Sequence, residues 1–310
     1  MEMKMNEITK KLLGVVSDFK EEFDGAYNIR EDGGCAGRKS SDHIRIEPKT
    51  EQPGIEIHIS SEAQQEKVYI PACVTHGAVD DLVYNDFYVA AGADVTIVAG
   101  CGVHTDSEES ARHNGIHRFF LEKGAHVKYE EKHIGTGTGK GIRSIDPVTD
   151  ATIGEDAVLE MNTIQIGGVD RTNRQTRARL GAGAKLIIHE SIMTDLEETA
   201  VTDFKVVMEG EDSGVDLISR SVARGHSRQE YHSKVEGLCR CTGHTECDAI
   251  LVDQGTVNAA PELYAGDLNA SLIHEAAIGK IAGEQIIKLR TLGLTEKEAE
   301  EKIIDGFLRG

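Results

Sequence analysis

The feature of the sequence that most constrains the fold is a short turn-then-strand unit that recurs through the middle of the chain. It begins at Gly92, Gly124, Glu155, Gly183 and, in a looser form, Asp212. The successive starting points are therefore 32, 31, 28 and 29 residues apart. A repeat of this length without a crossover helix is typical of a solenoid, in which each coil adds strands to continuous sheets. An antiparallel sandwich would not require such a constant interval, so the repeat predicts a mainly β protein built as a parallel β-helix.

The two ends of the chain differ from this repeat. Residues 5–23 place apolar side chains at helical spacing, which predicts an amphipathic N-terminal helix. Helical spacing returns after Pro261, where Thr295 and Glu298 form the capping box expected at the start of a last helix. The chain is therefore divided into an N-terminal helical segment (1–38), a parallel β-helix core (39–260) and a C-terminal helical segment (261–310).

Charge and hydropathy exclude several classes of partner. The 310 residues include 53 acidic and 34 basic side chains, which gives a net charge of -19. Such a surface repels phosphate backbones and anionic lipid, so we expect neither a nucleic-acid nor a membrane partner. The N-terminus does not read as a signal peptide, and no apolar run reaches the ~20 residues of a membrane span. We expect a cytoplasmic protein in which the cysteines are reduced thiols or metal ligands.

Most of the soft metal ligands fall within one short stretch. These are Cys239, Cys241, His244 and Cys247, followed by His274 and Glu275 just ahead of the C-terminal helices. Thiolate and imidazole groups are the ligands that zinc, iron and iron-sulfur clusters prefer. However, the spacing differs from the CxxC pairs of zinc knuckles, and cysteines on a strand can also pack as small apolar side chains. The pattern alone leaves a metal site and a packing role open.

Two further motifs do not indicate a catalytic site. The glycine-rich stretch 135–140 lacks the first glycine and the final hydroxyl residue of a phosphate-binding loop, so we interpret it as a solvated turn. His113 and His117 are four residues apart, but Asn114-Gly115 between them is a turn signal, which predicts that these histidines line coil corners. No local nucleophile signature is present, so a hydrolase is not supported.

The C-terminal third resembles the SufB/SufD family of iron-sulfur cluster assembly proteins, and its compact size resembles the short archaeal SufB-like scaffolds (SmsB). The segments that carry the resemblance are 246–251, 260–262, 272–279, 283–285, 289–290 and 303–307. The likeness is strongest over residues 155–310 and weaker before them. It implies a right-handed parallel β-helix flanked by helical segments, which agrees with the fold that the repeat predicts.

The resemblance also implies a function and its residues. Members of the family are scaffolds without an enzymatic activity of their own, on which a nascent iron-sulfur cluster is built and then passed to recipient apo-proteins. ATP hydrolysis is expected in a SufC-like ABC ATPase docked on the C-terminal segment. Cys247 falls on the family's cluster-assembly cysteine, and Glu275 and His274 fall on its proposed co-ligands. A minimal system would pair two copies of this chain as a homodimer.

Cys239, Cys241 and His244 are additional soft ligands beyond these family positions. They leave an alternative from a different class, in which the chain is a structural solenoid that holds zinc at Cys239, Cys241, His244 and Cys247 and has no role in cluster assembly. Metal analysis of protein purified without oxygen separates the two hypotheses. Iron with acid-labile sulfide supports the scaffold, and stoichiometric zinc that survives chelation supports the alternative.

Overall fold

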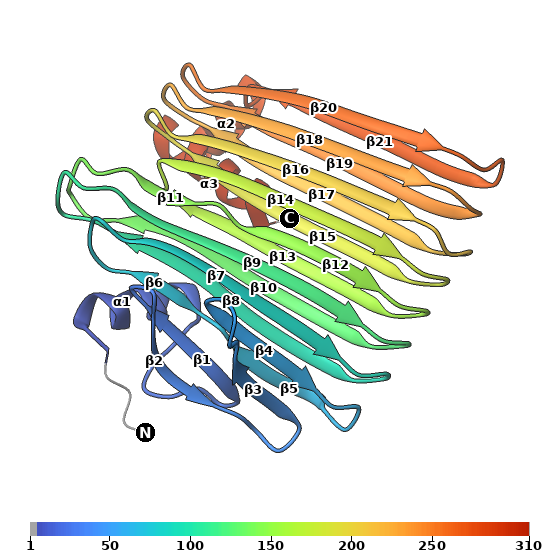
Figure 1. Ribbon diagram of the computed structural model, residues 1–310. Coiled ribbons are helices and arrows are strands. Elements are labelled where there is room, and N and C mark those ends of the chain that lie inside the picture. The colour runs from blue at the N-terminus through green and yellow to red at the C-terminus, as the bar shows by residue number, and fades with distance from the viewer. Residues whose placement is uncertain (1–4, 310) are drawn as a thin grey trace.

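The computed structural model describes residues 5–309, apart from the side chain of Ile166, and it is the parallel solenoid that the repeat predicts (Figure 1). Two sheets run the length of the molecule, one of 11 strands and one of 10. Paired residues in neighbouring coils lie about one repeat apart in sequence. Asp94 pairs with His126, 32 positions on, and Val158 pairs with Lys185, 27 positions on.

Most coils contribute one strand to each sheet. Sheet A contains β1 (Ala26–Glu31), β2 (Gly34–Lys39), β5 (Gln64–Tyr69), β6 (Ala72–Val74), β8 (Asp94–His104), β10 (His126–Thr136), β13 (Val158–Gly167), β15 (Lys185–Thr194), β17 (Gly214–Ala223), β19 (Cys241–Leu251) and β21 (Ala270–Gly279). Sheet B contains β3 (Ile44–Pro48), β4 (Gly54–Ile59), β7 (Asp80–Val89), β9 (Ala111–Leu121), β11 (Arg143–Ile145), β12 (Val148–Ile153), β14 (Arg171–Leu180), β16 (Thr199–Met208), β18 (Arg228–Gly237) and β20 (Thr256–Ala265). The described strands pair in parallel except for β1 with β2 and β3 with β4.

The sequence repeat corresponds to the corner at which the chain enters β8, β10, β13, β15 and β17 of sheet A. The backbone is left-handed at Gly92, Gly124, Asp156, Gly183 and Asp212, with φ between 55° and 72°. Glycine adopts this region at little cost, and aspartate tolerates it better than most residues. At the first four of these corners the next residue is a fully buried alanine, because only a small side chain fits inside the turn. The turn-then-strand motif therefore recurs because each of these corners requires the same backbone conformation and a small side chain.

Side chains alternate between the interior and the solvent along each strand, as in β19. The inward positions of both sheets meet in one continuous core, in which Phe87 and Phe119 stack at 4.6 Å between their ring centroids. The position of a residue within its strand therefore decides whether its side chain faces the core or the surface.

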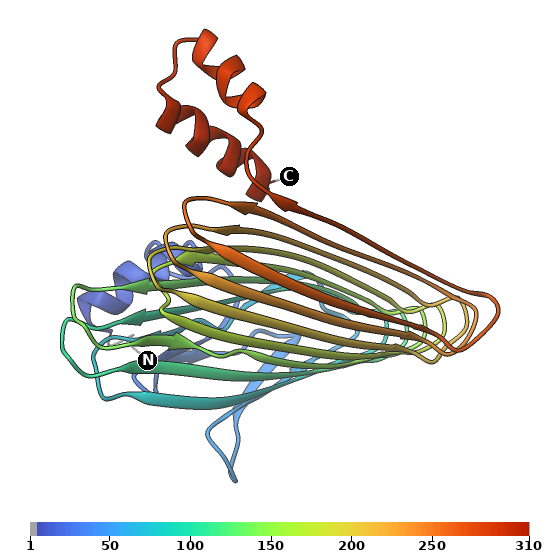
Figure 2. The ribbon, with the colours of Figure 1, turned by 90° about the horizontal axis from the view of Figure 1, so that it is seen from above.

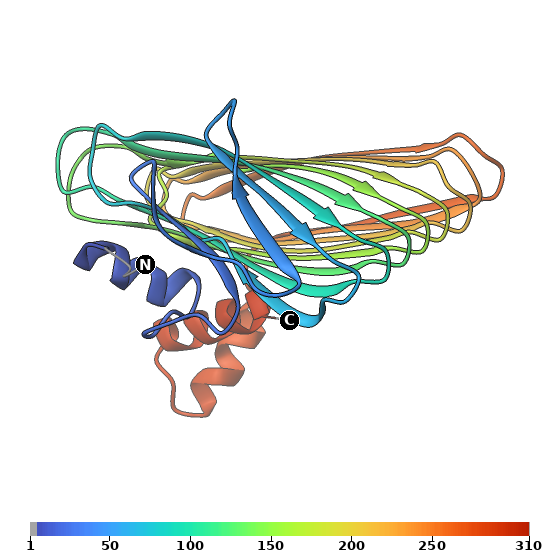
Figure 3. The ribbon, with the colours of Figure 1, turned by 60° about the horizontal axis from the view of Figure 1, so that its bottom comes forward.

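The N-terminal helix α1 (Glu7–Val16) packs on the outer face of sheet A (Figure 3). It is shorter than the predicted span 5–23. Asn6 caps it by accepting a hydrogen bond from the backbone N–H of Thr9 at 2.8 Å. Gly100 of β8 allows the close approach of the helix, because a Cβ at this position would lie 2.4 Å from the carbonyl oxygen of Val16.

The strands continue beyond the expected boundary at residue 260. β20 and β21 form a last coil that ends at Gly279, and the C-terminal helices begin only at Gly283. Residues 261–279 are thus mostly strand and not helix, which corrects the return to helix expected after Pro261. The side chains of this coil are less buried than those of earlier coils, so its sequence lacks the strong apolar alternation of an enclosed strand.

The helices α2 (Gly283–Thr291) and α3 (Glu296–Arg309) form a hairpin that projects from the solenoid on the side of sheet A (Figure 2). The predicted capping box is confirmed, since Thr295 Oγ1 accepts from the N–H of Glu298 at 3.3 Å and Glu298 Oε2 accepts from the N–H of Thr295 at 2.8 Å. The hydroxyl of Ser191 in β15 donates to the carbonyl of Leu308 at 2.9 Å and anchors α3. Among the described helices, none combines the length and apolar character needed to cross a membrane.

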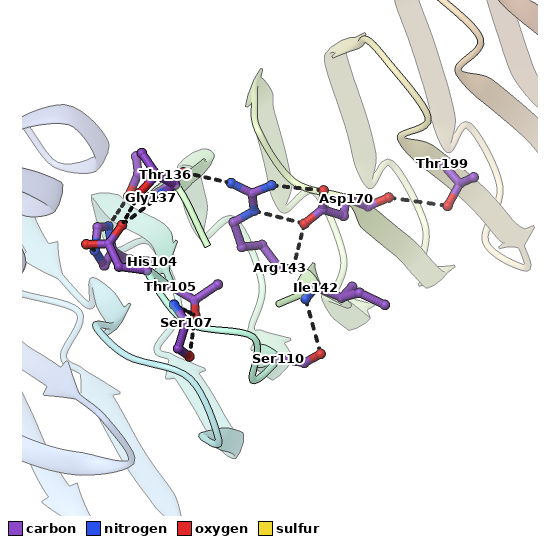
Figure 4. A network of polar contacts seen from close by, with 12 residues as sticks. His104, Thr105, Ser107, Ser110, Thr136, Gly137, Ile142, Arg143, Asp170 and Thr199 are labelled. Carbon is purple, nitrogen blue, oxygen red and sulfur yellow. Dashed lines mark hydrogen bonds and ion pairs between the residues drawn. The ribbon is translucent and has the colours of Figure 1, made fainter. Parts of the chain in front are cut away.

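The glycine-rich stretch 135–140 packs against a neighbouring coil (Figure 4). Arg143 donates to the carboxylate of Asp170 from Nε and Nη2 at 2.8 and 3.0 Å, and from Nη1 to the carbonyl of Gly137 at 3.2 Å. Gly137 has a φ of 99°, and a Cβ there would lie 2.2 Å from the carbonyl oxygen of Thr105. Close packing between coils therefore accounts for this glycine without a phosphate ligand.

The placement of His113 and His117 at coil corners is wrong. Both lie inside β9 and point inward, and Asn114-Gly115 is part of the strand and not a turn. A Cβ at Gly115 would lie 2.8 Å from Nε2 of His117 and 3.3 Å from Nε2 of His113, so the glycine makes room for two buried imidazoles. His113 Nδ1 lies 3.0 Å from Asp81 Oδ2.

Candidate metal-binding site

The six predicted ligands lie on or beside the last two strands of sheet A, and they divide between its two faces. Cys239, Cys241, Cys247 and His274 are on the inner side, whereas His244 and Glu275 are on the outer side. β21 is the last strand of the sheet, so this region borders its open end.

Cys247 lies in the interior between Ser219 of β17 and Ala276 of β21. Its side chain is only 2 % exposed and lines a small internal cavity with Glu190 and Tyr231. Burial, assisted by the nearby Glu190 carboxylate, raises the pKa of the Cys247 thiol to about 12. The thiol is therefore protonated at neutral pH and requires a bound metal to displace its proton.

His274 stands on the inner side of β21, next to Thr245 of β19. The hydroxyl of Thr245 lies 2.6 Å from Nδ1 of His274, while Nε2 is shielded from solvent without a hydrogen-bond partner. Burial lowers the pKa of this imidazole, which favours its neutral form. In the tautomer that donates from Nδ1 to Thr245, Nε2 keeps a lone pair that a metal could accept.

A second group of ligands forms on the outer face of the same strands. One ligand atom from each of His244, Glu246 and Glu275 lies within 4.8 Å of the other two. His244 Nδ1 is 2.8 Å from Asp216 Oδ1, and its Nε2 is 4.0 Å from Glu275 Oε2. A carboxylate on one ring nitrogen is the usual means of orienting the other nitrogen toward a metal. A ligand set of one imidazole and two carboxylates is suited to bind iron, manganese or zinc.

The zinc alternative with Cys239, Cys241, His244 and Cys247 does not fit this geometry. Cys241 and Cys247 are six residues apart on one extended strand, which separates them by roughly 20 Å. His244 points to the opposite face, and Cys239 Sγ is 3.0 Å from the carbonyl oxygen of Gly210. Zinc ligands lie about 2.0–2.3 Å from the ion, so these four side chains cannot hold one ion, and the packing role explains Cys239 and Cys241.

The sequence reasoning missed a network of charged side chains in the core. Arg174 Nη1 lies 2.7 Å from Glu131 Oε2, and its Nε lies 3.3 Å from Glu190 Oε1 without forming a hydrogen bond. Glu190 accepts from Thr202 and Ser219 at 3.1 and 2.8 Å. Ser219 pairs with Cys247 in sheet A, so the network extends to the residue beside this thiol.

The same network explains another group of ligand types. Cys101, Glu131 and His133 are buried and bring ligand atoms within 4.8 Å of one another. Arg174 already neutralises Glu131, and its Nη2 lies 3.3 Å from His133 Nδ1. Burial alone would raise the pKa of Glu131, but His133 and Arg174 hold it well below its usual value. We interpret the group as part of an ion-paired core, because a fixed cation already stands beside its carboxylate.

The alternation of inward and outward positions along each strand would have revealed this network. Arg174 and Glu190 occupy inward positions of β14 and β15, where an enclosed solenoid should carry apolar side chains. By charge alone, Arg174 cannot be told apart from its outward neighbours Arg177 and Arg179.

Comparison with known proteins identifies a family that covers most of the chain. Residues 83–307 match the family described as "SUF system FeS cluster assembly, SufBD core domain". Two relatives are named "Iron-sulfur cluster assembly SufBD family protein". The one from Methanothermobacter thermautotrophicus is 29 % identical over 77 % of this chain and 58 % of its own length. The one from Archaeoglobus fulgidus is 30 % identical over 78 % of this chain and 65 % of its own length.

A chloroplastic member of the family from Arabidopsis thaliana is 23 % identical over 70 % of this chain and 40 % of its own length. The chain thus spans less than two thirds of the length of these curated relatives. The match to the family covers the solenoid from β7 onward together with both C-terminal helices. On this evidence the chain belongs to the SufBD family of iron-sulfur cluster assembly proteins.

Proposed function

We propose that this protein is a non-enzymatic scaffold on which a nascent iron-sulfur cluster is built at the open end of the solenoid before transfer to apo-proteins. The observation that carries the proposal is the placement of Cys247, His274 and Glu275 on β19 and β21, the two strands nearest the open end of sheet A. Within the described chain β21 has a free edge. A cluster held at this edge is accessible from both faces of the sheet.

The donor set suits iron and sulfide chemistry. Thiolate, imidazole and carboxylate all bind iron, and the buried thiol supplies the strongest soft ligand. When Fe²⁺ binds the Cys247 thiol, the S–H proton is released and an iron–sulfur bond forms, so assembly releases protons. The outer His244, Glu246 and Glu275 provide the harder donors that iron prefers before sulfide arrives. Iron and sulfide are the cargo of this process and come from donors outside the chain.

The C-terminal hairpin supports a role for a partner ATPase. α2 buries none of its side chains, and Ile287 and Leu292 are exposed on the hairpin. An exposed apolar helix pair is suited to bind a groove of another protein. We assign this surface to a SufC-like ABC ATPase, in which ATP hydrolysis would take place.

The last coil supports pairing of two copies. Leu263, Tyr264, Ile273 and Ile278 of this coil are exposed large apolar side chains, and the outer edges of β20 and β21 are unpaired within the described chain. Free edges and apolar side chains favour association. In a homodimer formed there, the candidate ligands of both chains would approach one interface.

Anaerobic reconstitution with Fe²⁺ and sulfide tests the function. We expect an iron-sulfur absorbance with acid-labile sulfide in the parent protein and a loss of most of it in Cys247→Ala. Cys241→Ala is the matched control, because it removes a buried thiol from the same strand at a distance from Cys247. Equal cluster yield in the parent and in Cys247→Ala would refute the assignment, and an equal loss in both variants would show only that the fold is damaged.

A further inference from the structure

A ladder of stacked rings runs along the outer face of sheet B. His58, Tyr88 and Phe120 occupy equivalent positions of β4, β7 and β9. Their ring centroids are 4.9 and 5.1 Å apart, with interplanar angles of 12° and 11°. Tyr88 and Phe120 are 37 % and 38 % exposed, so the rings present their edges to solvent. The stacking distance follows the strand spacing of about 4.8 Å.

The stack of rings ends in a gap after Phe120, because the next residue in the row is not aromatic. The next position after Phe120 is Thr152 of β12, and the one after that is Arg179 of β14. Two strand spacings, about 9.6 Å, separate Phe120 from Arg179, while the threonine between them is too short to reach the height of a ring. At a contact distance of about 3.5 Å on each side, this space admits one flat ring and not two. A cavity of about 390 Å³ lies here and is lined by Phe120, Thr152 and Arg179.

The charge around the gap is positive in a protein that is strongly acidic as a whole. Arg118, Arg177, Arg179 and Lys205 line the cavity with a single carboxylate, Asp150. Arg118 is paired with Asp86 at 2.7 Å, Arg179 with Glu209, and Arg177 with Asp150 at 3.9 Å. Among the described residues, Lys205 has no carboxylate within 4.0 Å. One uncompensated cation therefore stands beside a slot of ring thickness.

We propose that this slot binds the flat heteroaromatic ring of a nucleoside phosphate. The ring stacks between Phe120 and the guanidinium of Arg179 and completes the ladder, while the phosphate pairs with Lys205. Stacking on an aromatic face and on a guanidinium plane tolerates any base. The slot is on the opposite sheet from the candidate metal ligands, so this binding is independent of cluster assembly and of its proposed site.

A macromolecular nucleic acid is a poorer fit than a single nucleotide. A continuous strand needs several stacking platforms and a long cationic track, whereas the gap is one rung wide and the net charge is -19. The free face of Phe120 and Lys205, the one lysine that lines this cavity and that has no carboxylate partner among the described residues, together specify one ring and one anionic group.

Titration calorimetry with adenosine 5′-monophosphate tests the proposal on the full chain. Thr152→Tyr adds the missing rung from the chain itself and should abolish binding, since no space for a ligand ring remains. Thr256→Tyr, also at an exposed position of a sheet B strand, is the control and should bind as the parent does. Phe120→Ala should weaken binding at least about fivefold, the lower range for loss of one stacking partner.

The phosphate contact is tested separately with Lys205→Gln. This variant should weaken binding of adenosine monophosphate and leave that of adenosine unchanged. Thermal unfolding followed by circular dichroism verifies that each variant is folded. No binding by the parent protein, unchanged binding by folded Thr152→Tyr, or inorganic phosphate binding as tightly as the nucleotide would each overturn the proposal.

Discussion

Cys247 and Glu275 extend from neighbouring strands of sheet A toward opposite faces of that sheet. Glu275 pairs in register with Glu246, the residue before Cys247, so the single-residue offset places the thiol in the core and the carboxylate on the surface. Both groups can reach one cluster only around the free edge of β21 or after this edge moves. The edge of the last coil is therefore the element on which joint ligation by these two residues depends.

The first prediction concerns the accessibility of the thiols. Iodoacetamide at pH 7.5 should modify exposed Cys35 rapidly and leave Cys247 almost unmodified, because the Cys247 thiol is buried and its pKa is raised to about 12. Peptide mass spectrometry over time measures both rates in one sample. Equal labelling of the two residues in folded protein would show that the open end exposes the thiol far more than the structure does.

The second prediction concerns the buried ion pairs. Arg174→Met should lower the free energy of unfolding by about 3–5 kcal/mol, because Glu131 and Glu190 would be left in the core without their cation. Arg177→Met on the exposed side of the same strand should change it by less than about 1 kcal/mol. Urea unfolding followed by circular dichroism gives both values. Similar losses in the two variants would contradict the role of the network.

The third prediction concerns pH. Burial lowers the pKa of His117 to about 4, below its ordinary value of 6.5, so the unfolded chain binds a proton between these values that the folded chain does not. His117 thus makes stability rise with pH between about 4 and 6.5, by up to roughly 3 kcal/mol. Urea unfolding at pH 5 and 7 should show a smaller difference for His117→Asn than for the parent protein. An unchanged difference would contradict a buried, neutral His117.

The fourth prediction concerns the helical hairpin. Deletion of residues 283–310 should abolish co-purification with a SufC-like ATPase and leave the solenoid folded, since the described strands of both sheets end at Gly279. Far-ultraviolet circular dichroism should retain its strand signal. Continued co-purification after the deletion would place the ATPase elsewhere on the chain.

The fifth prediction concerns a cluster site shared between the two copies of the proposed dimer. Cys247→Ala and Glu275→Ala proteins should each assemble little cluster alone, and a mixture with proven subunit exchange should recover part of the yield. Recovery is expected because one interfacial pocket of the mixed dimer would hold an intact Cys247 and an intact Glu275. No recovery, or a chain that stays monomeric at every concentration, would leave ligation within one chain as the remaining arrangement.

The sequence predicted the solenoid because its corners impose a local requirement. A residue that tolerates a positive φ, followed by a small one, recurs at five successive corners, and this pair is visible without any knowledge of packing. The last coil was missed for the opposite reason. Its strands are only partly enclosed, so selection for inward apolar side chains is weak, and Pro261 suggested an interruption.

The candidate site was located in sequence by family resemblance, but the face on which each ligand lies was not predicted. That assignment requires counting each residue from the start of its strand, because alternate positions face the core and the surface. Such a count would have separated Cys247 from His244 and excluded the zinc arrangement. The charged core was hidden for a related reason, since Arg174 is one of several arginines in β14 and only its inward position distinguishes it.

The coil that carries His274 and Glu275 stands at one end of the stack. Each interior coil is held by hydrogen bonds on two sides, whereas β20 and β21 pair on one side only within the described chain. In a stack with nearest-neighbour stability, the terminal unit opens at the lowest free energy. Amide hydrogens of β20 and β21 should therefore exchange with solvent first. A ligand held there would make and break its bonds on the most easily opened backbone of the solenoid, which favours a cargo that must leave.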